Sequence, residues 1–111
     1  MLYKQLKKIK KNKDFSYIYK TGRKVYVKNI GIFWIKSRRP ETGYGITTSK
    51  RFKNAVTRNK IRRRVRSIIK EEVFFEGLMF IVYVKETALT LSFAGLKEEI
   101  QQGLLRAKII K

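Results

Sequence analysis

The chain has 111 residues, with 28 Lys or Arg against 8 Asp or Glu, a formal net charge of +20, and neither Cys nor His. The length predicts one domain over residues 1–111 that can bury a core of its own. The lack of Cys excludes a disulfide framework and suits the cytoplasm, and the longest apolar runs, 31–35 and 78–84, are too short to span a membrane.

The positive charge is concentrated in one part of the chain. Residues 1–70 contain 23 basic and 2 acidic residues, whereas residues 71–111 contain 5 and 6. Such an uneven basic excess is typical of a nucleic-acid-binding protein. An anionic membrane would instead require a basic helix with an exposed apolar face, and the apolar positions here fit a core. We therefore expect a nucleic acid as the partner.

The residue pattern predicts seven elements. Strands are predicted where β-branched and aromatic residues dominate, and helices where apolar residues recur every three or four positions. In chain order these elements are a helix over 12–20, strands over 24–28, 30–37 and 44–49, a helix over 55–72, a strand over 79–85 and a helix over 92–109. Asn12 and Ser92 are the predicted caps of the first and last helices. The order αβββαβα predicts an α+β protein, a two-layer sandwich of helices on one sheet.

The helix over 55–72 combines an apolar stripe with a basic remainder. At 100° per residue, its aliphatic side chains fall on one side: Ile61, Val65, Ile68 and Ile69. The opposite side and one flank carry Asn59, Arg63, Arg66, Lys70, Arg58 and Arg62. No carboxylate occurs in this helix before Glu71, so salt bridges within the helix do not account for the basic side. Arg is the side chain that holds phosphate in a fixed, bidentate geometry.

Groups that could perform catalysis are scarce. Without His or Cys, an active site would have to be built from eight carboxylates, most of them in adjacent pairs or near helix ends. A protein nuclease needs a general base, a covalent nucleophile or carboxylates that hold Mg²⁺. Residues 43–45 also lack the spacing of a Gly-rich phosphate loop. We expect no catalytic residue and no metal site in the protein itself.

Three segments resemble a known family. The sequence SKRFKNAVTRNKIRRRVR, residues 49–66, resembles the signature of the bacterial ribonuclease P protein subunit. DFSYIYKTGR (14–23) is similar to the first helix of that family, and MFIVYVKETA (79–88) to its fourth strand and the following turn. Lys53 stands where the family often has Gly, and Lys60 replaces the second Arg of an Arg-Asn-Arg triplet, which keeps the charge and loses a bidentate group.

The resemblance implies a fold and a mechanism. The implied fold has one mixed four-stranded sheet and a left-handed βαβ crossover, an exception to the usual right-handed rule. In the implied mechanism the RNA subunit is the catalyst and requires Mg²⁺; no cofactor is assigned to the protein alone, and whether it also holds Mg²⁺ near the leader is left open. The protein binds the catalytic RNA and the 5′ leader of precursor tRNA, and thereby assists removal of the leader.

The resemblance also assigns residues to two surfaces. Those expected to face the catalytic RNA are Lys50, Arg51, Lys53, Asn54, Arg58, Asn59, Lys60, Arg62, Arg63 and Arg66. Those expected in a leader-binding cleft are Phe15, Tyr19 and Phe33, because unpaired bases stack on aromatic rings. An apolar helix face is also what core packing produces, so the pattern leaves open whether these rings belong to the cleft or to the core.

Two other classes of protein remain as alternatives. A ribosomal or other structural RNA-binding protein without a processing role would share the charge and the lack of catalytic groups. A helix-turn-helix DNA regulator could use residues 55–70 as its recognition helix, but it would need a partner helix a few residues upstream. Residues 44–52, YGITTSKRF, predict strand and loop there, so DNA is not the expected partner.

Overall fold

The structure is a computed structural model that describes residues 2–3 and 6–110. Its elements in chain order are β1 (Leu2–Tyr3), β2 (Leu6–Lys8), α1 (Asn12–Thr21), β3 (Arg23–Val27), β4 (Ile30–Lys36), β5 (Thr42–Thr48), α2 (Ala55–Lys70), β6 (Phe74–Phe75), β7 (Leu78–Val84), a 3₁₀ helix (Glu86–Thr90) and α3 (Phe93–Ala107). The seven predicted elements are all present, within about two residues of their predicted bounds. The α+β class is therefore confirmed.

The main sheet has the strand order β2-β5-β7-β4-β3. β7 pairs parallel to β5, from which α2 connects to it, and antiparallel to β4. The four predicted strands thus form one mixed sheet, but the predicted number of strands was wrong, because β2 adds a fifth, parallel strand beside β5. β1 and β6 form a separate antiparallel pair. The left hand of the β5-α2-β7 crossover remains an implication of the family resemblance.

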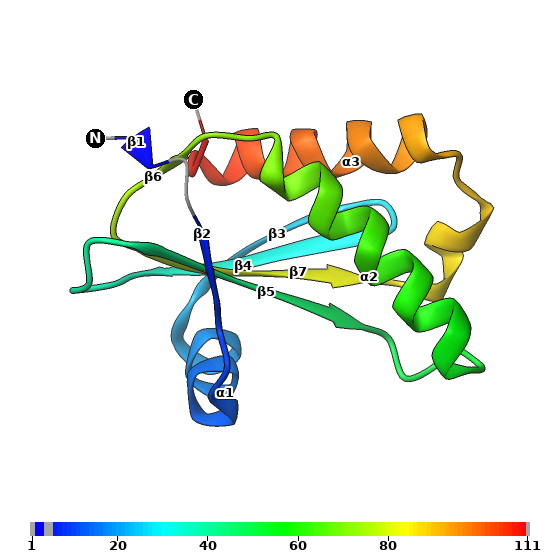
Figure 1. Ribbon diagram of the computed structural model, residues 1–111, viewed down its shortest axis with the longest axis horizontal. Helices are drawn as coiled ribbons and strands as arrows, with labels where there is room; N and C mark the ends of the chain where they lie inside the picture. Colours follow the sequence, from blue (N-terminus) through cyan, green and yellow to red (C-terminus); the bar gives the residue numbers. More distant parts are fainter. Residues whose placement is uncertain (1, 4–5, 111) are drawn as a thin grey trace.

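Helices lie on both faces of this sheet (Figure 1). α2 and α3 pack on one face and form the predicted two layers, whereas α1 packs against the other face and adds a partial third layer. The alternation along β4 explains this, since Ile30 and Ile32 face α2 and α3 while Phe33 faces α1. The sheet therefore presents one fully covered face and one partly covered face.

The larger core lies between the sheet and the helices α2 and α3. The predicted stripe of α2 is confirmed, since its four aliphatic side chains are at most 2% exposed. Phe74 stacks on Phe80 with ring centroids 4.6 Å apart, which fixes the chain between α2 and β7 to the sheet. Each fully buried aliphatic side chain contributes about 1.5–3 kcal/mol. Burial of this stripe sets the direction in which the rest of α2 faces.

The helix ends follow local rules, with one exception to the predicted caps. Ser92 caps α3, accepting a hydrogen bond from the Gly95 backbone N–H at 3.1 Å. Asn12 is not the cap, because it is already the first residue of α1 and Lys11 occupies the cap position. α1 ends at Gly22, where a Cβ would lie only 2.4 Å from the Ile18 carbonyl oxygen. No helix in the described ranges is long and apolar enough to cross a membrane.

Candidate nucleic-acid interface

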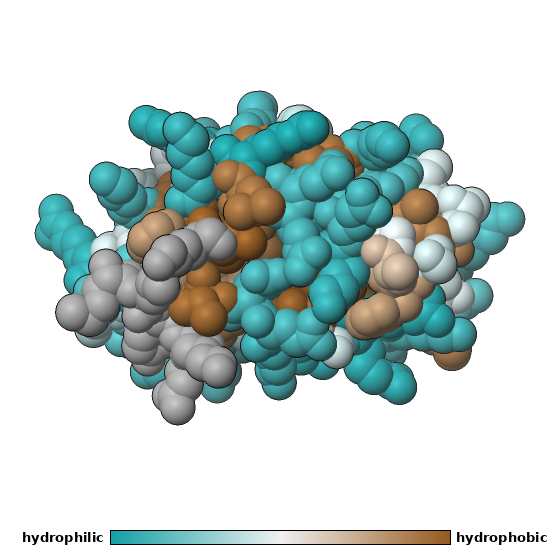
Figure 2. All heavy atoms as spheres, turned by 90° about the horizontal axis from the view of Figure 1, so that it is seen from above, coloured by the Kyte–Doolittle hydropathy of each residue, from teal (hydrophilic) through white to brown (hydrophobic). Residues whose placement is uncertain are grey.

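The loop between β5 and α2 continues directly into the solvent-facing side of α2, and together they carry the predicted basic residues. Figure 2 shows the molecule from the side of α2 and α3, where hydrophilic side chains cover most of the surface. We call this set the basic surface: Lys50, Arg51, Lys53, Asn54, Arg58, Asn59, Lys60, Arg62, Arg63 and Arg66. All of them are exposed or half-buried, on one loop and the helix that follows it.

The Lys and Arg side chains of α2 have no carboxylate partner in the part of the chain that the structure describes. The two acidic residues that follow the helix are turned toward α3 instead. Glu71 pairs with Lys97 at 2.8 Å, and Glu72 accepts a hydrogen bond from the Gln101 side-chain amide at 2.7 Å. The charge of α2 is therefore not neutralised within the fold and is available to an external anion.

Two of the predicted residues also shape the start of α2. The Asn54 side chain accepts hydrogen bonds from the backbone N–H and the hydroxyl of Thr57, both at 2.9 Å, and so caps the helix. The Arg58 guanidinium donates to the carbonyl oxygen of Phe52, a buried residue, at 3.2 Å. Asn54 is thus a structural cap, and Arg58 ties the loop to the helix while remaining half-buried.

Arg51 has a carboxylate partner, unlike the cations of α2 within the described residues. Its guanidinium lies 3.8 Å from the Glu86 carboxylate, while its side chain remains 83% exposed. Hydrogen bonds from its own backbone N–H and from Ser49, together with the charge of Arg51, hold the pKa of Glu86 below its ordinary value. An ion pair this exposed is weak, so Arg51 keeps its capacity to contact phosphate.

The second surface lies on the other face of the sheet, beside α1. The Tyr19 ring packs edge-on against Phe33 with centroids 4.7 Å apart, and its hydroxyl is hydrogen-bonded to the Thr47 hydroxyl. Burial is the main cause that raises the pKa of Tyr19, and the hydrogen bond with Thr47 opposes it. Phe33 is only 8% exposed, whereas Tyr19 is 38% exposed. Phe33 is therefore the floor of this surface and Tyr19 one of its walls.

The sequence prediction missed a second tyrosine against Phe33, which is Tyr26. Its ring packs edge-on against Phe33 at 5.8 Å and is 52% exposed. Gly31 makes room for it, since a Cβ there would lie 3.0 Å from the Tyr26 ring. The Lys85 amine lies 5.9 Å from the centroid of Tyr26, within reach of a cation–π contact. We call Tyr19, Tyr26 and Phe33 the aromatic cluster.

Phe15 packs in the same small hydrophobic core as Phe33 but forms no ring pair with Tyr19, Tyr26 or Phe33. Its ring packs over Gly45, where a Cβ would lie 2.5 Å from the ring, so it fills the space between α1 and β5. It is half-buried in the small core with Ile18. Of the three predicted cleft residues, Phe15 thus packs α1 onto the sheet, Phe33 forms a buried floor, and Tyr19 is the one with a substantial exposed face.

A metal site has little support among the acidic residues. Across residues 2–3 and 6–110, no three of the His, Cys, Asp and Glu side chains gather closely enough to hold a metal ion. Several carboxylates have partners already: besides Glu71, Glu72 and Glu86, Glu99 accepts two hydrogen bonds from Asn29, both at 3.0 Å, and Glu41 pairs with Lys7. What the two surfaces offer is phosphate binding by cations and base stacking by rings.

Comparison with known proteins points to a single family. The family model described as Ribonuclease P matches residues 3–108. The ribonuclease P protein component of Streptococcus pneumoniae is 29% identical over 106 residues, covering 94% of this chain and 86% of that protein. The structure of the Staphylococcus aureus RNase P protein superposes with a TM-score of 0.86 at 29% identity, covering 94% and 97% of the two chains. The fold also matches the RNase P protein from Thermotoga maritima, with a TM-score of 0.80 at 23% identity over 90% and 96% of the chains. The chain belongs to the ribonuclease P protein family.

Proposed function

We propose that the basic surface of this ribonuclease P protein binds the catalytic RNA and that the aromatic cluster holds the 5′ leader of precursor tRNA. Because the chain belongs to this family, it is the protein component of a ribonuclease that processes tRNA 5′ ends. The alternative of a ribosomal protein is thereby excluded. The observation that carries the assignment of surfaces is the run of α2 cations that have no carboxylate partner among residues 2–3 and 6–110.

The basic surface suits a folded RNA. A-form helices hide their base edges in a narrow major groove, so a protein contacts them mainly through phosphate and sugar. A rigid helix with guanidinium groups along one side matches that target, because Arg binds phosphate with two parallel hydrogen bonds. Arg62 and Arg66 lie along the flank of α2, half-buried, where their orientation is restricted. Arg64 is half-buried on the other flank and extends the predicted set by one residue.

The aromatic cluster suits an unpaired strand. Tyr19 and Tyr26 both pack edge-on against Phe33, and each has an exposed face on which a base can stack. Such stacking contributes about 1–3 kcal/mol per base and tolerates different bases. Mature tRNA has no leader to place there, so contacts at this cluster favour the precursor over the product.

In this proposal the RNA subunit performs the cleavage and requires Mg²⁺, and the protein itself binds no cofactor. Support comes from the absence of His and Cys in the sequence and from the carboxylates already engaged by Lys7, Lys97, Arg51 and Asn29. The protein then contributes binding energy and charge neutralisation. We place it in the cytoplasm beside its RNA, a reducing compartment that suits a chain without Cys.

Reconstitution tests the proposal. We expect the purified protein alone to leave precursor tRNA intact, and to raise cleavage by its cognate RNA subunit at limiting Mg²⁺. Precursor with a leader should bind the assembled complex more tightly than mature tRNA. Cleavage by rigorously RNA-free protein, or equal affinity for precursor and mature tRNA, would overturn it.

A further inference from the structure

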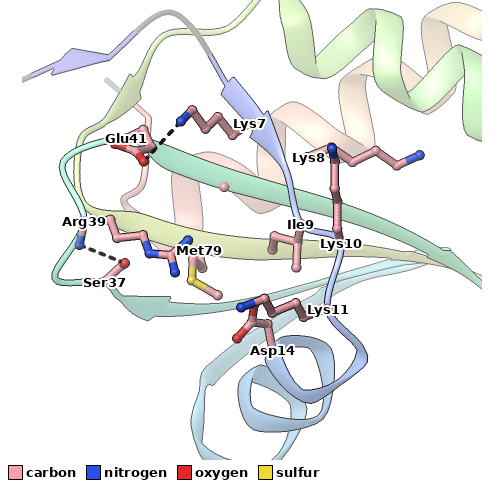
Figure 3. Close-up of a pocket in the computed structure, with 11 residues that line it drawn as sticks. Lys7, Lys8, Ile9, Lys10, Lys11, Asp14, Ser37, Arg39, Glu41 and Met79 are labelled. Atoms are coloured by element: carbon pink, nitrogen blue, oxygen red, sulfur yellow. Dashed lines mark hydrogen bonds and ion pairs between the residues drawn. The ribbon is translucent and has the colours of Figure 1, made fainter.

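A pocket with a basic rim lies on the α1 face of the sheet, apart from both surfaces described above. It has a volume of about 260 Å³ and lies between β2, the start of α1, the β4–β5 turn and β7 (Figure 3). This volume is just below the roughly 300–1,000 Å³ of typical small-molecule sites. The size suits one compact chemical group better than an extended ligand.

The floor of the pocket is apolar and open. Ile9, Gly43 and Met79 line it. A Cβ at Gly43 would lie 3.2 Å from Ile9 Cγ1 and 3.5 Å from Met79 Cγ, so any larger residue there would begin to fill the space. The thioether of Met79 packs favourably against the edge of an aromatic ring. The floor therefore offers an apolar surface against which a flat ring can pack.

The rim is cationic. Two acidic and five basic residues line the pocket, the basic ones being Lys7, Lys8, Lys10, Lys11 and Arg39. One of the acids, Glu41, is paired with Lys7 at 3.4 Å, and Asp14 is the other. The Lys8 side chain extends away from Ile9 and Met79 (Figure 3), so it does not contribute to the rim. Figure 3 shows Arg39 beside Met79 and Lys11 beside Asp14, both at the mouth of the pocket.

From this floor and rim we propose that the pocket binds one unpaired nucleotide of RNA, with its base against Ile9 and Met79 and its phosphate between Lys11 and Arg39. A free phosphate would use only the rim and an apolar molecule only the floor, whereas a nucleotide uses both. The inference rests on the proposed function, since it takes RNA to be the polyanion that this protein binds.

The pocket is separate from the aromatic cluster, although both lie on the same face of the sheet. Met79 lines the pocket, whereas Tyr83, four residues along β7, pairs with Gly31 beside Tyr26. Four residues of a strand span about 13 Å. Asp14 of α1 lines the pocket while Tyr19 belongs to the aromatic cluster, so α1 contributes to both. One RNA strand crossing this face would reach both sites in succession.

A matched pair of double variants tests the rim. Lys11→Ala/Arg39→Ala removes two cations from the pocket, and Lys13→Ala/Arg38→Ala removes two exposed neighbours that do not line it. The probe is a fluorescein-labelled oligouridylate octamer, and affinity is measured from low to high salt. Because one phosphate contact is lost, we expect the pocket pair to flatten the log–log salt slope by about 0.7 and the control pair to change it by less than half as much. Equal changes in both pairs would overturn the proposal, since they would indicate diffuse attraction only.

A floor variant tests the base. We expect Met79→Ala to weaken binding of the octamer by about 2- to 10-fold through the lost sulfur–ring contact. It should leave binding of an octamer that lacks its bases unchanged. Melting curves of both proteins establish the temperature at which each is folded. If Met79→Ala weakens both probes equally, or neither, no base occupies the floor and the proposal fails.

Two further measurements with Lys11→Ala/Arg39→Ala identify the source of the nucleotide. A loss confined to precursor tRNA with a long leader assigns it to the leader, and a loss in binding of the catalytic RNA assigns it to the RNA subunit. No loss with either RNA would overturn the proposal for the assembled enzyme. Variants of Arg62 and Tyr19 test the proposed function independently, so its failure is distinguishable from failure of the pocket.

Discussion

Tyr19 offers the sharpest test of the aromatic cluster, because two of its groups have separate roles. Its hydroxyl is hydrogen-bonded to Thr47, and its ring both covers Phe33 and keeps an exposed face. Tyr19→Phe removes only the hydroxyl, whereas Tyr19→Ala also removes the ring. We expect Tyr19→Phe to lower stability and spare leader binding, and Tyr19→Ala to lower both.

The magnitudes follow from these contacts. Loss of the hydrogen bond in Tyr19→Phe should cost about 1 kcal/mol, a decrease in melting temperature of about 4–6 °C for a domain of this size. Deleting a fully buried aromatic side chain costs about 3–5 kcal/mol. Tyr19 is 38% exposed, so we expect Tyr19→Ala to cost roughly 2–3 kcal/mol of stability. The lost stacking should weaken precursor binding by about 1–3 kcal/mol, or about 5- to 150-fold.

The assay combines thermal melting with equilibrium binding of precursor and mature tRNA to the reconstituted enzyme, at a temperature where each variant is folded. Affinity for mature tRNA should hardly change in either variant. The reasoning would be refuted if Tyr19→Ala lowered both affinities equally, or if Tyr19→Phe weakened precursor binding as much as Tyr19→Ala does.

Three further predictions concern charge and the end of a helix. Arg62→Ala/Arg66→Ala should flatten the log–log salt dependence of binding to the catalytic RNA by about 1.4–1.8 with little change in melting temperature; an unchanged slope would mean that neither side chain contacts phosphate. Asn54→Ala should cost about 1 kcal/mol of stability through the lost cap, measured by denaturant unfolding, and Asn54→Asp should restore most of it. A backbone hydrogen bond and Lys7 hold the pKa of Glu41 below its ordinary value near 4.5. The ionised Glu41 therefore stabilises the fold above that value, and this contribution is lost as pH falls through the lower folded-state pKa. Glu41→Gln should consequently show a shallower decline of melting temperature with acidity below about pH 4.5 than the parent protein; parallel declines would argue against the interaction.

Much of the fold could be predicted because its major elements have clear patterns in the local sequence. The stripe of α2 and the strand over Leu78–Val84 each bury enough apolar surface to leave a clear pattern. β2 leaves no such pattern. Its sequence, Leu-Lys-Lys, is short and mostly charged, as befits an edge strand whose Lys side chains discourage further pairing. Its partner β5 begins 36 positions later, at Thr42, and only the folded chain brings the two together.

The candidate site could be predicted in part for the same reason. The basic surface is contiguous in sequence and its charge is visible without a structure. The aromatic cluster is assembled from α1, β3 and β4, so its membership depends on tertiary packing. Alternation within Arg23–Val27 places Tyr26 on the face opposite Val25 and Val27, a signal that could have suggested it. The burial of Phe33 beneath two tyrosines has no counterpart in local pattern.

The cations of α2, which have no carboxylate partner in the described part of the chain, also affect folding. In the free protein they repel one another, and a net charge of +20 raises the free energy of the compact state. Added salt screens this repulsion, so the melting temperature of the free protein should rise with ionic strength. The same salt weakens binding to RNA, because counterions released from the RNA into a more concentrated salt solution gain less entropy. Stability of the free protein and affinity for its RNA thus respond to ionic strength in opposite directions, and assembly with the RNA stabilises the fold most at the low salt concentrations where the protein alone is weakest.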